Sequence, residues 1–119
     1  MHAARLRRGE DIARVRAEGI ARNDKLFSLR ALSNDGPAVR VAVSASRAVG
    51  GAVKRNRARR RVREAVRIVL RDHATAAGPH SPPEPHGMDL VLLVRPAALH
   101  APAGDLHGAV QRELGRVLR

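Results

Sequence analysis

The stretch that decides the fold is Ser-Ala-Ser-Arg-Ala-Val-Gly-Gly-Ala-Val-Lys-Arg-Asn-Arg-Ala-Arg-Arg-Arg-Val-Arg-Glu, residues 44–64. It begins at the end of a β-branched, alternating run and passes through Gly50 and Gly51 into a helical pattern. From Ala52 to about His73, apolar residues recur on one helical face, namely Ala58, Val62, Ala65, Val66 and Val69. The stretch therefore predicts a strand, a glycine turn and a long amphipathic helix.

The same helix concentrates the positive charge of the chain. Residues 54–71 contain nine basic side chains and one acid, Glu64, for a net charge of +8 against +12 for the whole chain. Much of this charge lies opposite the apolar face, at Asn56, Arg60, Arg63, Arg67 and Arg71. Glu64 is spaced to hold Arg60 and Arg67 extended. Such a helix would pack on a sheet and present cations to a polyanion.

Two other interpretations of this helix are a solvated surface and a membrane-surface helix. Solvated faces usually mix the two signs of charge, whereas this one is almost entirely positive. The apolar face is rich in Ala and Val and lacks the larger groups that insert well into a bilayer. Nucleic-acid binding is the interpretation that the pattern favours.

Upstream, the chain predicts one helix and two strands. Gly9–Glu18 has helical apolar spacing with acids in its first turn, and Gly19 is a plausible stop. Leu26–Leu32 and Val39–Ser46 alternate as strands do, and Asn34–Pro37 between them is a strong turn signal. We expect the two strands to form a hairpin.

Downstream, the expected elements are a loop, a strand and a helix. Residues 75–87 form a Pro-rich surface loop, Met88–Val94 is a buried-strand pattern, and Ala103–Leu118 has apolar residues at helical spacing. The order helix-strand-strand-helix-strand-helix predicts an α+β sandwich with a mostly antiparallel sheet. The long helix could carry a parallel crossover between strands, which the general rule would make right-handed.

Length and composition limit the class of protein. The 119 residues suit one domain, which we take to be a single nucleic-acid-binding domain over 1–119. Its core must be aliphatic, because Phe27 is the sole Phe, Tyr or Trp. The absence of cysteine excludes disulfides and thiolate sites. Without a membrane-length apolar run or an N-terminal signal pattern, a cytoplasmic protein is expected.

Residues 44–64 resemble the signature of the bacterial ribonuclease P protein component. That signature has a Ser-x-Ser-basic strand end, a Gly-x-Ala-Val turn and then Arg-Asn-x-x-basic-Arg-x-x-Arg. Its last part is matched at Arg55, Asn56, Arg59, Arg60 and Arg63. Weaker similarity covers residues 5–11 and 89–96, and thus most of the chain outside the Pro-rich loop.

The resemblance implies an α/β sandwich with an unusual left-handed βαβ crossover around the basic helix, and we prefer that hand to the general rule. It implies a non-catalytic subunit of an endoribonuclease that matures the 5′ end of tRNA. The implied partners are the ribonuclease P RNA subunit, which performs the hydrolysis with Mg²⁺, and the 5′ leader of precursor tRNA. No cofactor of the protein itself, no membrane and no obligate protein partner is expected.

The resemblance also assigns site residues. Those expected to bind RNA are Arg47, Lys54, Arg55, Asn56, Arg57, Arg59, Arg60, Arg63 and Arg67. Those expected to line a leader cleft are Ile12, Arg16, Leu26, Leu29, Ser44 and Ser46. The family carries aromatic residues in that cleft, whereas the matching positions here are not aromatic. Phe27, one position from Leu26 along the strand, is expected to face the other side, toward the core.

Other functions remain as alternatives at this point. A ribosomal or ribosome-assembly protein fits the composition but leaves the Arg55-to-Arg63 spacing unexplained. A histone-like DNA-binding protein is less favoured, because nothing resembles a dimerising strand arm. The histidines are scattered without a carboxylate cluster, and Ser44 and Ser46 lack candidate His-Asp partners in sequence. No independent catalytic or metal site is therefore expected.

Overall fold

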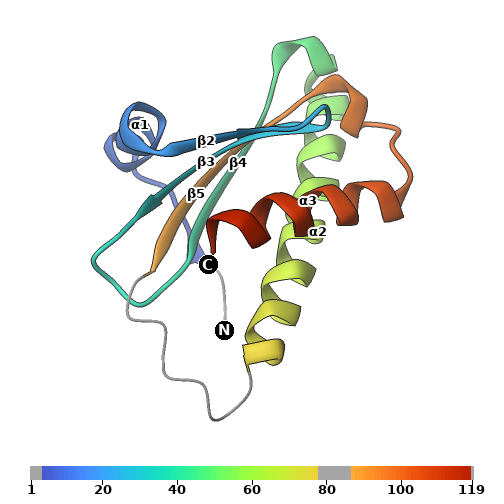
Figure 1. Cartoon of the computed structure of the whole chain (residues 1–119). Helices are drawn as coiled ribbons and strands as arrows, with labels where there is room; N and C mark the ends of the chain where they lie inside the picture. Colours follow the sequence, from blue (N-terminus) through green and yellow to red (C-terminus); the bar gives the residue numbers. More distant parts are fainter. Residues whose placement is uncertain (1–3, 78–86, 119) are drawn as a thin grey trace.

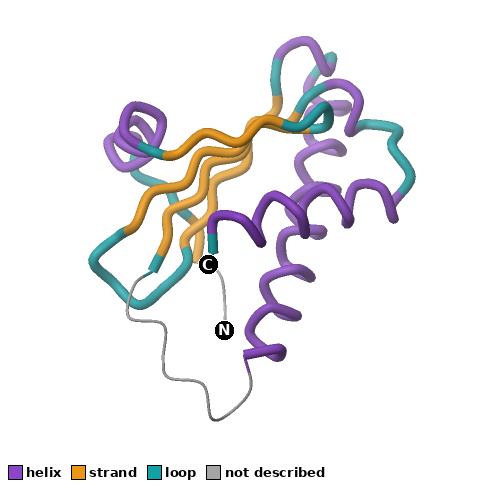
Figure 2. Tube along the Cα trace, viewed as in Figure 1, coloured by secondary structure: helices purple, strands orange, loops and turns teal. Residues whose placement is uncertain are grey.

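The computed structural model describes residues 4–77 and 87–118, which form one five-stranded sheet with helices on both of its faces (Figures 1 and 2). The elements are, in order, β1 (Ala4–Arg5), α1 (Gly9–Glu18), β2 (Ile20–Asn23), β3 (Phe27–Ser33), β4 (Arg40–Ala45), the 3₁₀ turn η1 (Arg47–Val49), α2 (Ala52–Ala77), β5 (Met88–Val94), the 3₁₀ turn η2 (Pro96–Ala98) and α3 (Ala103–Val117). The α+β class and the three expected helices are confirmed.

The sheet is mixed, with strand order β1-β4-β5-β3-β2. β5 pairs in parallel with β4 and antiparallel with β3, and β1 pairs in parallel with β4. The expected hairpin between β3 and β4 is therefore wrong, because β5 lies between them. The hairpin that does form joins β2 to β3, where the Asp24 carboxylate accepts a hydrogen bond from Leu26 N–H at 3.0 Å. The parallel crossover through α2 is present, and its left-handed sense stays a prediction.

Strand alternation divides the apolar side chains between the two faces. The larger core lies under α2 and α3, and includes Phe27, Leu29, Leu90 and Leu92, each fully buried. A smaller cluster under α1 joins Leu6, Val15 and Val91. Figure 1 shows α1 on one side of the sheet and the crossing helices α2 and α3 on the other. Phe27 belongs to the core, as expected.

Helix α2 follows the sequence pattern closely. All five residues of its predicted apolar face are buried, with exposed fractions between 0% and 7%. Its start depends on Gly50, whose φ of 136° lies in a region that side chains rarely adopt. The helix continues to Ala77, so the Pro-rich loop expected from residue 75 begins later; its residues 78–86 lie outside the described part of the chain.

Two arginine contacts fix the frame of the fold, one beside α2 and one on the opposite face of the sheet. Arg61 donates hydrogen bonds to the carbonyl oxygens of Ala98, Leu99 and Ala101, which holds the segment before α3 against α2. On the opposite face, Arg40 pairs with the buried Asp89 through two hydrogen bonds of 2.8 and 2.7 Å. A paired carboxylate is the form in which a buried charge is tolerated.

Candidate nucleic-acid interface

One side of α2 faces the open edge of the sheet formed by β1 and β4, and cations line the space between them. This basic groove consists of two hollows of about 570 and 380 Å³, and we define it by Arg5, Asn56, Arg59, Arg60, Arg63 and Arg67. The α2 members are spaced by three or four residues, so they share one helical side. Five of the nine residues expected to bind RNA are thereby brought together.

Arg5 is the member that sequence reasoning missed. It lines both hollows, and it does so because β1 pairs with β4 in the register Arg5↔Val41. The basic run at residues 5–8 was a signal in the sequence. However, a two-residue strand has too short a pattern to predict its partner.

Positive groups crowd each other at the centre of the groove. The pKa of Arg63 is below its ordinary value, first because of burial and then because of the neighbouring charges of Arg5 and Arg59. Arg63 keeps its charge nevertheless, since guanidinium groups do not lose a proton in proteins. An anion placed between these groups would relieve the repulsion. The groove is therefore electrostatically suited to an anionic ligand.

A single carboxylate moderates the charge at one end of the groove. Glu64 accepts hydrogen bonds from Arg67 at 2.6 and 3.1 Å, and this contact lowers the pKa of Glu64 and raises that of Arg67. The predicted contact to Arg67 is confirmed, while the structure records no pair with Arg60. The Arg67 side chain is consequently held beside the groove.

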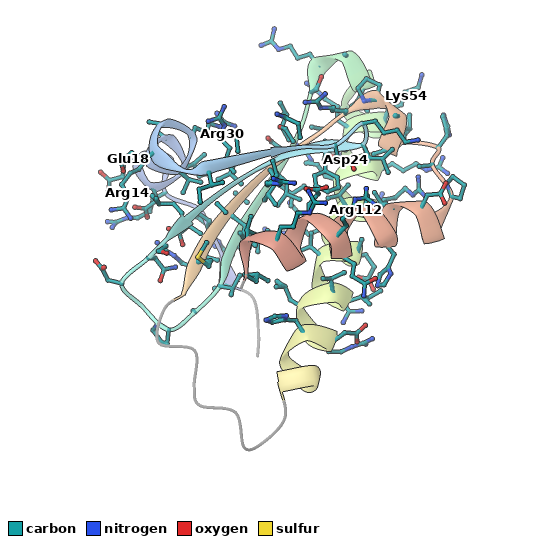
Figure 3. The ribbon with its side chains drawn as sticks, viewed as in Figure 1. Arg14, Glu18, Asp24, Arg30, Lys54 and Arg112 are labelled. Atoms are coloured by element: carbon teal, nitrogen blue, oxygen red, sulfur yellow. The ribbon has the colours of Figure 1, made fainter. Side chains whose placement is uncertain are left out.

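The remaining predicted RNA-binding residues lie outside the groove lining. Lys54 and Arg57 are exposed on other sides of α2, Arg55 is half-buried near its start, and Arg47 is exposed in η1. Figure 3 shows Lys54 at the η1 end of the molecule, well away from α1. These four cations extend the positive surface around the start of α2.

A third hollow, the α1 cleft, lies between α1 and the sheet edge. Its volume is about 300 Å³, and Ile12, Arg16 and Ser44 line it together with Arg5 and Arg63. The α1 cleft and the basic groove therefore share Arg5 and Arg63. The Ser44 hydroxyl oxygen is buried without a hydrogen-bond partner among the residues that the structure describes. Its hydrogen-bonding capacity is therefore not used by the described residues.

Leu26 and Leu29 do not line this cleft, contrary to expectation. They are 3% and 0% exposed, and both pack in the core under α2 and α3. For Leu29 the physical reason is strand parity, because Leu29 lies two residues from Phe27 and both point to the same face, whereas Leu26 precedes β3 in the β2–β3 turn. Sequence reasoning had placed Leu29 and Phe27 on opposite faces of the sheet.

Beside the predicted Ser44, the cleft side of the sheet presents three residues that sequence reasoning missed, namely Ser28, Arg30 and Leu93. The registers Ser44↔Leu93 and Ser28↔Leu93 place Leu93 between two serines, and Leu93 is 38% exposed. Arg30, on the same face of β3, donates a hydrogen bond to the Arg16 carbonyl oxygen at 2.9 Å. The alternation of polar residues in β3 was the available signal for Ser28 and Arg30.

The other residues singled out from sequence have local roles. Ser46 accepts a hydrogen bond from Ala48 N–H at 3.1 Å and so caps η1. His73 and His100 are exposed, and His107 is half-buried. In the described residues no group of three or more potential metal ligands occurs. No helix in residues 4–77 and 87–118 is both long enough and apolar enough to cross a membrane.

Comparison with known proteins identifies a family. The family model described as Ribonuclease P matches residues 1–118. Proteins named ribonuclease P protein component include one from Chloroflexus aurantiacus, 42% identical over 87% of this chain and 70% of its own length. Another, from Bartonella quintana, is 36% identical over 95% and 82%. One from Caulobacter vibrioides is 44% identical over 59% of this chain, and the match spans about half (48%) of that relative.

Solved structures of similar fold agree. The ribonuclease P protein of Staphylococcus aureus superposes with a TM-score of 0.71 over 98% of this chain and 96% of its own, at 20% identity. That of Thermotoga maritima superposes with a TM-score of 0.63 over 94% and 97%, at 21% identity. At this identity the likeness supports the fold.

Proposed function

This chain belongs to the bacterial ribonuclease P protein family, and we propose that it binds the RNA subunit of ribonuclease P through the basic groove. The observation that carries this proposal is the convergence of Arg5, Arg59 and Arg63 in one hollow, where burial and like charge lower the pKa of Arg63. Guanidinium groups pair with phosphate bidentately, and phosphate contacts supply much of the affinity for nucleic acid. The cations around the start of α2 would extend the contact.

We further propose that the α1 cleft and the adjacent cross-strand row of Ser28, Leu93 and Ser44 bind the single-stranded 5′ leader of precursor tRNA. The cleft offers a guanidinium at Arg16 and a buried hydroxyl without a partner at Ser44. Ile12 stands at a position where the family resemblance leads one to expect an aromatic residue, and Leu93 adds a second aliphatic group between the two serines. Leader binding would then depend on phosphate pairing and aliphatic packing, with little base stacking.

In this proposal the RNA subunit and the protein have different roles. The RNA subunit carries out Mg²⁺-dependent hydrolysis, and the protein positions the precursor and screens phosphate charge. Because Arg5 and Arg63 line both the basic groove and the α1 cleft, the RNA subunit and the leader would meet at the same cations. The protein would therefore contribute most when Mg²⁺ is scarce and phosphate repulsion is least screened.

Reconstitution with a bacterial ribonuclease P RNA and a precursor tRNA tests the function. The protein should stimulate removal of the leader at low Mg²⁺, and protein freed of RNA should not process the precursor. Efficient 5′ processing by the protein alone would contradict the proposal. The RNA that copurifies with the protein from cells distinguishes this function from that of a ribosomal protein. We expect one structured RNA, that of ribonuclease P, and copurification of ribosomal RNA would contradict the proposed function.

A further inference from the structure

The larger hollow of the basic groove has a lining that phosphate binding alone does not explain. It is about 570 Å³ in volume, and its ten lining residues are five arginines, one glutamate and four aliphatic residues. The neighbouring hollow of about 380 Å³ has one aliphatic residue, Val43, among cations and Asn56. Two adjoining hollows on the same helix therefore differ in chemistry.

The aliphatic part of the larger hollow lies between the helix and the sheet edge. Val66 and Leu70 from α2 are almost fully buried, and Val41 from β4 is half-buried. Arg63 and Arg67 lie on the same side of α2, and Glu64 accepts hydrogen bonds from Arg67. The hollow thus has an aliphatic floor, on which Val41 is the most accessible of the three residues, beside cations and an acceptor for the polar edges and charged substituents of a flat group.

An unpaired nucleotide matches this combination. Single-stranded or bulged bases expose apolar faces that protein side chains and guanidinium planes cover, whereas a duplex backbone presents phosphate and sugar alone. The volume falls within the range of about 300–1,000 Å³ common for sites that enclose a small molecule. A phosphate on each side of the base would reach the flanking arginines.

We propose that this hollow holds one unpaired nucleotide of the RNA subunit, with its base against Val41, Val66 and Leu70 and its phosphates paired with Arg63 and Arg67. The inference rests on the proposed function and deepens it, because it assigns base contact to a helix otherwise expected to bind backbone. Binding of the RNA would then include a component that added salt does not weaken.

Methyl NMR of the isolated protein provides the first test. Phe27 is the sole Phe, Tyr or Trp and is fully buried, and no histidine is among the residues that line the hollow, so new ring-current shifts at the hollow's methyl groups would come from a bound base. Adenosine 5′-monophosphate should shift the methyl signals of Val41 and Leu70, while ribose 5-phosphate and inorganic phosphate should leave them in place. Equal shifts from all three compounds, or none from the nucleotide, would overturn the proposal.

The second test uses the ribonuclease P RNA and a variant that fills the hollow. Val41→Phe should lower RNA affinity by about tenfold, within the range for loss of one base contact. The slope of affinity against salt should change little, because Arg63 and Arg67 remain and the phosphates on either side of the displaced base can still reach them. Ile68→Phe is the matched control: Ile68 is half-buried on the same helix and is not among the residues that line the hollow, and it lies seven residues from Arg61, on the side that faces the segment before α3. It should bind RNA as the wild type does.

The outcomes separate the inference from the function on which it rests. Equal affinities for wild type and a folded Val41→Phe variant, with folding checked by thermal melting, would overturn the nucleotide site and leave the proposed function intact. Equal losses in Val41→Phe and Ile68→Phe would overturn it as well. Failure of the wild-type protein to bind ribonuclease P RNA would instead defeat the proposed function.

Discussion

Leu93 offers a direct way to examine leader binding on the open face of the sheet. Its side chain is 38% exposed between Ser44 and Ser28. Replacing it by Phe adds a π face where the wild type has aliphatic groups. Stacking of one base on an aromatic side chain contributes about 1–3 kcal/mol. Since Leu93 already supplies apolar contact, we expect a gain near the lower limit, about 1 kcal/mol or roughly fivefold in Kd.

The assay is the ratio of affinities for precursor tRNA with a long leader and without a leader, measured with the assembled ribonucleoprotein. Leu93→Phe should raise this ratio about fivefold, because the leaderless substrate leaves the surface empty. Ile20→Phe is the control, since Ile20 is also exposed but pairs with Ala31, whose side chain is buried under α2 and α3 on the other face. A ratio that stays fixed in a folded Leu93→Phe variant would refute the leader surface.

Four further predictions concern the frame of the fold and are measured by chemical or thermal unfolding. Asp89→Ala leaves Arg40 without its buried partner and should lower the free energy of unfolding by about 3 kcal/mol, at the low end of the range for a broken buried pair because Arg40 is about one-third exposed. A decrease of less than about 1 kcal/mol would contradict this prediction. Arg61→Met removes the hydrogen bonds that hold the segment before α3 and should destabilise by about 2 kcal/mol. Gly50→Ala should destabilise by about 1–3 kcal/mol through its positive φ, whereas a neutral effect would show that the turn adapts. Burial alone would raise the pKa of Asp24, but the Leu26 N–H and Arg112 hold that pKa below its ordinary 3.8. The contribution of Asp24 to the free energy of unfolding is therefore present above that value and is lost as the pH falls through the lowered pKa. Asp24→Asn should flatten this acid dependence of stability, and an unchanged pH profile would contradict the prediction.

The contact from Arg112 illustrates which parts of the fold were beyond the sequence. It joins α3 to the β2–β3 turn across 88 residues, as Figure 3 shows for Arg112 and Asp24. Periodicity correctly predicted α1, α2 and α3, because each helix carries its own apolar stripe. It did not predict that β5 would lie between β3 and β4, because alternation marks a strand but does not name its partner.

The candidate site shows the same division. The cations of α2 were predictable from one helix, and the structure places five predicted residues in one groove. The residue that the sheet contributes, Arg5, was not predictable, because it reaches the groove through the pairing of β1 with β4. For the leader cleft, an error in strand parity exchanged the buried Leu29 for the half-exposed Ser28. Residues from one element were predicted well, and residues brought together by tertiary pairing were not.

The salt dependence of binding to ribonuclease P RNA tests the central role of the basic groove most directly. Arg60→Ala/Arg63→Ala should weaken binding and flatten the log-log salt slope by about 0.7–0.9 for each lost phosphate contact, so by up to about 1.8. Arg14→Ala/Arg116→Ala removes the same charge from exposed positions outside the groove and should change the slope far less. Equal changes in both double variants would contradict the account, because the positive charge would then act as a diffuse cloud without a groove.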